Sequence, residues 1–234
     1  MDRITRKDLK TDKFAVEVTH TVEYLGEHRS SLYRYGAIIL AVLLVGGGVY
    51  FYMRSQHDAR QQALADALQA QNAPASPVGN PFIKSFNSQA EKDAAVDKAF
   101  SDIVAKYGGS DEAAIANYML GTYAADKGKM ADAEKRFKAA AESGKSGYAS
   151  LAKLALSDIY VSEGKAAEAE KLLRDIVANP SILVSKEQAT IALARIVGQK
   201  NPAEAQKLLE PLRTVSGATG QAAMNAITEI TAKK

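Results

Sequence analysis

The segment ANYMLGTYAADKGKMADAEKRF, residues 116–137, aligns without a gap to AKLALSDIYVSEGKAAEAEKLL, residues 152–173. The alignment pairs Leu120 with Leu156, and residues 189–209 follow the same pattern after one deletion. Self-similarity over this length cannot arise from one isolated helix. It indicates that the chain is built from repeated structural units.

Four short copies within these segments set the period. They are AAVDKAF, ADAEKRF, AEAEKLL and AEAQKLL, which begin at residues 94, 131, 167 and 203. Successive copies are separated by 37, 36 and 36 residues, and each ends in a large apolar residue. A period of this size predicts a solenoid, in which a unit buries its apolar face only against its neighbours.

Each period contains the pattern of two helices joined by a short turn. Apolar residues at three- and four-residue spacing predict the first helix, and the second begins at the Ala-rich copy. Gly128 and Gly164 favour the left-handed conformation that ends a helix, and Pro202 suits the first turn of the helix that it opens. Close approach of the two helices explains the recurring small residues Ala133, Ala169 and Ala205.

These features resemble the tetratricopeptide repeat. In the first complete unit the family's Leu-Gly pair falls on Leu120 and Gly121 and its aromatic on Phe137, whereas Asn117 and Ala124 replace its Trp and Tyr. The resemblance implies an all-α fold with an α-solenoid of three to four helical hairpins. The segment GATGQAAMNAITEITAKK, residues 217–234, is expected to form a C-terminal capping helix.

A second feature is the apolar stretch GAIILAVLLVGGGVYFYM, residues 36–53, which contains no charge, amide, histidine or proline. A helix of this length covers about 27 Å, close to the thickness of a bilayer's hydrocarbon core. The ends carry residues that favour the membrane–water interface, namely Tyr33, Arg34, Tyr35, Tyr50, Tyr52 and Arg54. We therefore predict a single transmembrane helix.

The span and the repeats divide the chain into five predicted parts. These are an N-terminal tail with an amphipathic helix (1–35), the transmembrane helix (36–53), a helical stalk (54–71), a Pro-rich linker (72–89) and the repeat domain with its capping helix (90–234). The tail helix has Phe14, Val18, Val22 and Leu25 on one stripe. It rests on the membrane surface, folds back on itself, or docks a cytosolic or membrane partner. Basic residues in the short tail favour a cytoplasmic N-terminus and a repeat domain on the other side of the membrane.

Composition argues against several classes of function. The net charge is only +3 and both signs are interleaved, which does not suggest nucleic-acid binding. The chain has no Cys, and its three histidines, His20, His28 and His57, all precede the repeats. Nucleophilic triads and the usual zinc ligand sets are therefore missing from the repeat domain. We expect no enzyme, no cofactor, no metal and no small-molecule substrate.

Binding of protein partners is the remaining prediction. The first helix of each tetratricopeptide unit lines the concave face at its second, fifth and ninth places. Those places hold Ile115, Tyr118, Thr122, Leu151, Leu154, Asp158, Gln188, Ile191 and Arg195. Such a mixed apolar groove suits an extended or helical segment of another protein. The alternative is that these side chains pack against the next helix.

The whole layout resembles the ancillary subunit of the Sec translocon in bacterial inner membranes. That resemblance implies a single-pass inner-membrane protein whose periplasmic domain contacts the translocon and envelope chaperones. The first hypothesis is therefore a membrane-anchored scaffold in secretion, chaperone action or envelope assembly. The alternative is a structural accessory subunit, permanently integrated into a larger membrane complex.

Overall fold

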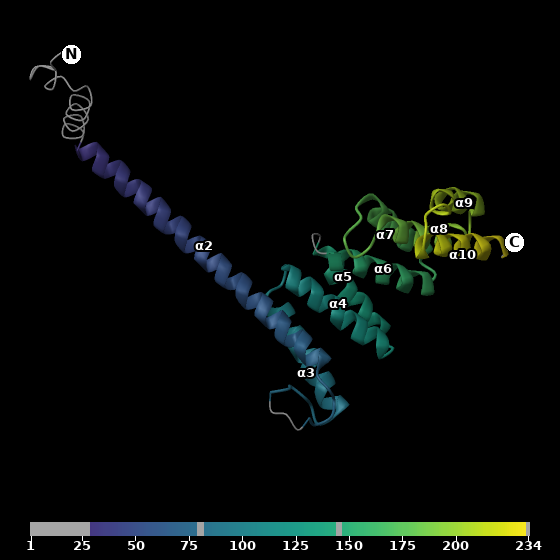
Figure 1. Cartoon of the computed structure of the whole chain (residues 1–234), viewed down its shortest axis with the longest axis horizontal. Helices are drawn as coiled ribbons and strands as arrows, with labels where there is room; N and C mark the ends of the chain where they lie inside the picture. The colour runs from purple at the N-terminus through teal and green to yellow at the C-terminus, as the bar shows by residue number, and fades with distance from the viewer. Residues whose placement is uncertain (1–28, 79–81, 144–146, 233–234) are drawn as a thin grey trace, which may run out of the picture. The chain divides into compact units, whose positions relative to one another are not determined.

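The computed structural model describes residues 29–78, 82–143 and 147–232, with the side chains of 29–32 left aside. The predicted amphipathic helix of the tail lies outside these residues. The chain forms two compact units, Met1–Asp58 and Ala59–Lys234. The long helix α2 (Arg29–Asn72) contributes residues to both units (Figure 1).

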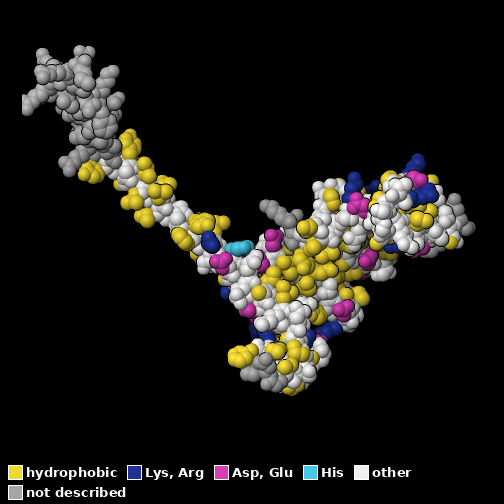
Figure 2. All heavy atoms as spheres, in the orientation of Figure 1, with side chains coloured by type: hydrophobic (Ala, Val, Ile, Leu, Met, Phe, Trp, Pro, Cys, Tyr) yellow, Lys and Arg dark blue, Asp and Glu magenta, His cyan; other side chains and the backbone are white. Residues whose placement is uncertain are grey.

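The described part of the first unit is the N-terminal portion of α2. Every large apolar side chain from Tyr33 to Met53 is more than half exposed, and Figure 2 shows hydrophobic side chains along this helix. Within the described residues, α2 is the one helix long and apolar enough to cross a membrane, by length and composition. Exposure of this kind is costly in water and ordinary in lipid.

The second unit is a series of helical hairpins. After the end of α2 come α3 (Gln89–Lys106), α4 (Asp111–Asp126), α5 (Met130–Glu142), α6 (Gly147–Ser162), α7 (Ala166–Ala178), α8 (Lys186–Val197), α9 (Pro202–Leu209), a short 3-10 turn (Glu210–Leu212) and α10 (Ala218–Ala232). From α3 to α9 each helix packs against the next, and α10 packs on α8 and α9 (Figure 1). The prediction of an all-α solenoid of three to four hairpins is confirmed.

The four sequence copies fall on the second helices of the hairpins, α3, α5, α7 and α9. Their terminal large residues are almost fully buried, with exposed fractions of 0%, 3%, 0% and 0% for Phe100, Phe137, Leu173 and Leu209. The small residues Ala133, Ala169 and Ala205 have no exposed surface. The small residues allow each second helix to lie close to its neighbours, and the large residues fill the remaining space. Because every unit packs in this way, the same pattern of small and large residues recurs in each one.

The turns between paired helices follow the sequence expectation. Gly128 and Gly164 have φ angles of +72° and +76°, in the left-handed region that favours glycine. Beside the first of them, the Lys129 amide donates to the carbonyl of Ala124 at 2.8 Å and closes the end of α4. In the third turn Pro202 lies in the first turn of α9, as predicted.

The compact repeat unit begins at Ala59, whereas the repeat pattern predicts a repeat domain that begins at residue 90. The last turns of α2 are the first helix of the first hairpin. Ala67 and Ala70 of α2 are 0% and 2% exposed and share a core cluster with Phe100 and Ile103 of α3. Alanine has a small apolar side chain and occurs in exposed helices as well as buried ones. The sequence of this segment therefore does not indicate that it packs against α3.

An ion pair fixes the end of α2 to the start of α4. The Nε atom of Arg60 lies 3.3 Å from Oε2 of Glu112, whose side chain is only 6% exposed. Burial disfavours ionisation of Glu112, but hydrogen bonds from its own backbone N–H and the Ser110 hydroxyl outweigh it and lower the pKa. Gln61 adds a long hydrogen bond to the other carboxylate oxygen, at 3.5 Å. Residues 60 and 61 therefore act as part of the repeat unit.

The segment between α2 and α3 is irregular where the structure describes it. Phe86 is buried, and its backbone N–H donates to the carbonyl of Pro74 at 3.0 Å. Phe82 is 93% exposed. The Pro-rich segment therefore connects the two helices of the first hairpin, and it packs against the core through Phe86 but not through Phe82.

Candidate partner-binding groove

A groove with a volume of about 490 Å³ lies between α6, α8 and α10. We call it the C-terminal groove. Its wall combines apolar and polar side chains, and it is lined by Leu154, Asp158, Ser185, Gln188, Ile191, Ala192, Arg195, Ala218, Thr219 and Ala222.

Five of the nine predicted binding residues line this groove. Leu154 and Asp158 come from α6, and Gln188, Ile191 and Arg195 come from α8. Residues three to four apart share one face of a helix, so the first helices of two adjacent units turn these side chains toward the same space. The structure thus brings together the predicted residues of the second and third units, with the exception of Leu151.

The predicted residues of the first unit, and Leu151, do not line this groove. Tyr118 stacks at an angle on Phe137 and Tyr148, with ring centroids 5.7 and 5.4 Å away. Burial raises the pKa of the Tyr118 phenol. Thr122 donates its hydroxyl to the carbonyl of Met119 at 2.7 Å, within its own helix. Ile115 and Leu151 are half-buried. Packing against neighbouring residues is therefore the local role of Tyr118.

Two charged groups give the C-terminal groove its polarity. The Nε atom of Arg195 lies 3.2 Å from Oε2 of Glu229 on α10, so this pair holds α10 beside α8. The carboxyl group of Asp158 forms no hydrogen bond or ion pair with another described residue, and desolvation raises its pKa. A cationic or hydrogen-bond-donating group of a ligand would offset the cost of that desolvation and favour the ionised carboxylate. The groove is therefore suited to a ligand with a donor near Asp158.

Sequence reasoning missed the contribution of α10. Ala218, Thr219 and Ala222 close one side of the groove, and Ser185 caps α8 at its edge. The residues of α10 belong to no repeat copy, so the repeat pattern carried no signal for them. Predicting the capping helix was possible, but predicting which face it covers was not.

The chemistry of this site is that of binding. Among residues 29–78, 82–143 and 147–232, no group of three or more His, Cys, Asp or Glu side chains is placed to hold a metal ion. Figure 2 shows hydrophobic side chains gathered over α4 and α6. A long apolar surface with a few polar points is typical of sites that bind segments of other proteins.

Hairpins stacked around such a groove define a helical-repeat protein of the protein-interaction scaffold class. The chain belongs to the tetratricopeptide repeat-like domain family, whose model matches residues 29–176, more than half of the chain. The matched region begins at the first residue of α2 and ends within α7, so it includes the apolar helix. No curated protein and no solved structure matches the chain.

Proposed function

We propose that this protein is a membrane-anchored scaffold of the bacterial inner membrane that binds segments of other proteins in its C-terminal groove. Its repeat unit faces the periplasm. The protein functions in secretion, chaperone action or envelope assembly, and its partners are the translocon and envelope chaperones. It is not an enzyme. The observation that carries the proposal is the convergence of Leu154, Asp158, Gln188, Ile191 and Arg195 on one groove.

The anchor follows from the apolar part of α2. A cleaved signal sequence has the same composition, but α2 continues as one helix into residues that fill the repeat core. Only residues 54–58 separate the end of the apolar stretch from the repeat unit. Retention of the span as an anchor would hold the binding unit at the membrane.

The proposal is tested by purifying the full chain from bacterial membranes in mild detergent. The double variant Asp158→Lys/Gln188→Lys reverses the polarity of the groove at two exposed positions. We expect the double variant to recover at least about tenfold less partner protein. A loss of about 1.4 kcal/mol or more in binding free energy raises the Kd by a factor of ten or more. The control Glu168→Lys/Asn225→Lys makes the same charge change at exposed positions outside the groove and is expected to have no effect.

Equal recovery with both double variants would contradict the groove assignment. Partners that stay bound in fixed ratio through a stringent salt wash would instead favour a permanent subunit of a membrane complex. Orientation has a separate readout: protease added to intact spheroplasts should digest residues 59–234. A protected repeat unit would overturn the periplasmic assignment.

A further inference from the structure

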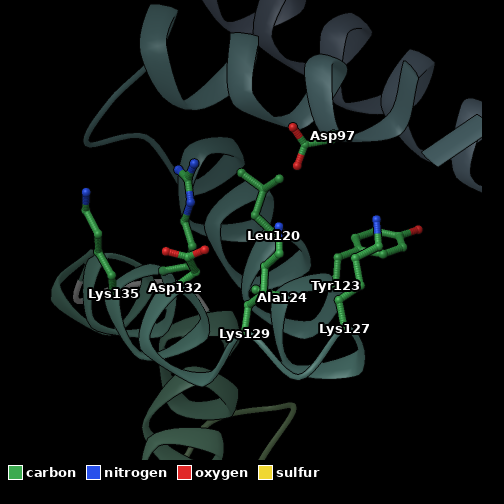
Figure 3. Close-up of a pocket in the computed structure, with 9 residues that line it drawn as sticks. Asp97, Leu120, Tyr123, Ala124, Lys127, Lys129, Asp132 and Lys135 are labelled. Atoms are coloured by element: carbon green, nitrogen blue, oxygen red, sulfur yellow. The ribbon is translucent and has the colours of Figure 1, made fainter. Parts of the chain in front are cut away.

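A second cavity, of about 240 Å³, lies between α3, α4 and α5 (Figure 3). We call it the N-terminal hollow. It is lined by Asp97, Leu120, Tyr123, Ala124, Lys127, Lys129, Asp132, Lys135 and Arg136, and it shares no residue with the C-terminal groove. The predicted binding residues do not include any of these nine.

Comparison of adjacent repeats explains why this hollow exists. The gap-free alignment of the two units pairs Ala124 with Tyr160. The Tyr160 ring packs against the core clusters on both sides of α6, and the ammonium groups of Lys138 and Lys165 lie 5.8 and 5.6 Å from its centroid. At the equivalent place in the preceding unit, Ala124 has only a methyl group. The hollow is therefore the space of a tyrosine side chain that this repeat lacks.

Two residues that surround the Tyr160 ring have counterparts in the N-terminal hollow, although the hollow has no tyrosine of its own. Glu134, which hydrogen-bonds with Tyr160, corresponds to Asp97 of the hollow. Lys165, which covers the Tyr160 ring, corresponds to Lys129. In Figure 3 Asp97 points from α3 toward the space above Leu120. The hollow thus has an acceptor, a cation and an apolar floor in the places where the next repeat uses them to hold a phenol ring.

The hollow also carries an excess of positive charge. Four cations line it, Lys127, Lys129, Lys135 and Arg136, against the carboxylates of Asp97 and Asp132. Lys127 is paired with Asp93 at 3.2 Å, outside the lining. No hydrogen bond or ion pair joins the side-chain ammonium group of Lys129 or of Lys135 to another residue that the structure describes. Negative groups beside an entering ring would find unpaired cations at the rim.

We propose that the N-terminal hollow binds a tyrosine side chain from an acidic segment of a partner protein. Its volume is below the roughly 300–1,000 Å³ of typical small-molecule sites, and it suits a single side chain. The ring lies over Leu120 with its hydroxyl donating to Asp97, and Lys129 contacts the ring face as Lys165 does in the next repeat. Acidic neighbours of the tyrosine pair with Lys135 and Arg136. This site is independent of the proposed role of the C-terminal groove.

The test uses the full chain in detergent micelles and two labelled peptides, DEDYDED and DEDADED, followed by fluorescence anisotropy. We expect the tyrosine peptide to bind at least about tenfold more tightly, the factor that a buried ring with one cation contact supplies. Ala124→Tyr fills the hollow from within and is expected to abolish this preference. The groove variant Asp158→Lys/Gln188→Lys should leave it unchanged, which separates this proposal from the function of the groove.

Equal affinity of the two peptides for the unmodified chain would overturn the proposal. A tyrosine preference that survives in Ala124→Tyr would overturn it as well. Thermal unfolding checks the variant itself, which is expected to fold with an unchanged or higher Tm because the next repeat already carries this residue. Lys129→Glu changes an exposed side chain and offers a second readout: it should lower the affinity for the tyrosine peptide, and an unchanged affinity would contradict the assigned cation contact.

Discussion

Replacing Ala67 by aspartate is expected to lower the free energy of unfolding of the repeat unit by about 4 kcal/mol, because a carboxylate would be buried without a partner. Ala67 has no exposed surface and lies in the core cluster that α2 shares with α3 and α4. Urea denaturation of the full chain in mild detergent, followed by circular dichroism, measures the change. The first hairpin should lose its packing before the rest of the unit.

A matched control lies two residues away on the same helix. Ala65 is exposed, so Ala65→Asp changes the same residue type without burying the charge. Its expected cost is below about 1 kcal/mol, the difference in helix propensity between the two residues. If the end of α2 were a solvated stalk, the two substitutions would cost the same. That result would remove residues 59–72 from the repeat unit.

Replacing Phe137 by alanine is expected to destabilise the unit by about 3–5 kcal/mol, the usual cost of deleting a buried aromatic side chain. The ring is 3% exposed, contacts Tyr118 of α4 and shares a core cluster with Leu156 of α6. The same urea titration measures the loss. A cost below about 1 kcal/mol would show that the ring is not packed in this cluster in solution.

Gly121 provides an internal check on the position of this ring. A β-carbon added at Gly121 would lie 2.7 Å from two ring carbons of Phe137, which is closer than real contacts allow. Gly121→Ala should therefore cost about 1–3 kcal/mol in the unmodified chain. In the Phe137→Ala background the clash is gone, and the same change should stabilise the helix by up to about 1 kcal/mol. Two additive substitutions would contradict the observed contact.

The repeats could be predicted because small residues, where helices approach closely, and large residues, which fill the space between helices, recur at a fixed spacing. Ala133 must be small where two helices meet, and Phe137, four residues on, must fill the space between units. The neighbouring repeat solves the same problem with Ser157 and Leu173 in place of Gly121 and Phe137. A residue larger than glycine fits there because leucine is smaller than phenylalanine. Such compensation preserves the pattern even where the identities differ.

The start of the repeat unit could not be predicted in the same way. Its first helix, the end of α2, is rich in alanine and glutamine, which suit an exposed helix as well as a closely packed one. A long connection replaces the short turn of the other hairpins, so no repeat spacing leads back to residue 59. The contact between Arg60 and Glu112 joins residues far apart in the chain, which periodicity does not detect.

The candidate site could be predicted in part. The rule that first helices line the concave face selected Leu154, Asp158, Gln188, Ile191 and Arg195, and the structure places these five around one groove. For Tyr118 the alternative applies, since its ring packs against Phe137 and Tyr148. The wall made by α10 could not be predicted, because its residues belong to no repeat copy.

Site-specific photo-crosslinking in intact cells tests the central claim most directly. A photoreactive phenylalanine at Gln188, in the C-terminal groove, is compared with the same group at Lys171, which is exposed on α7. We predict discrete protein adducts at Gln188 and not at Lys171, and we predict that adding Asp158→Lys removes them. Adducts at neither position, or equally at both, would contradict the assignment of this groove as the partner-binding site.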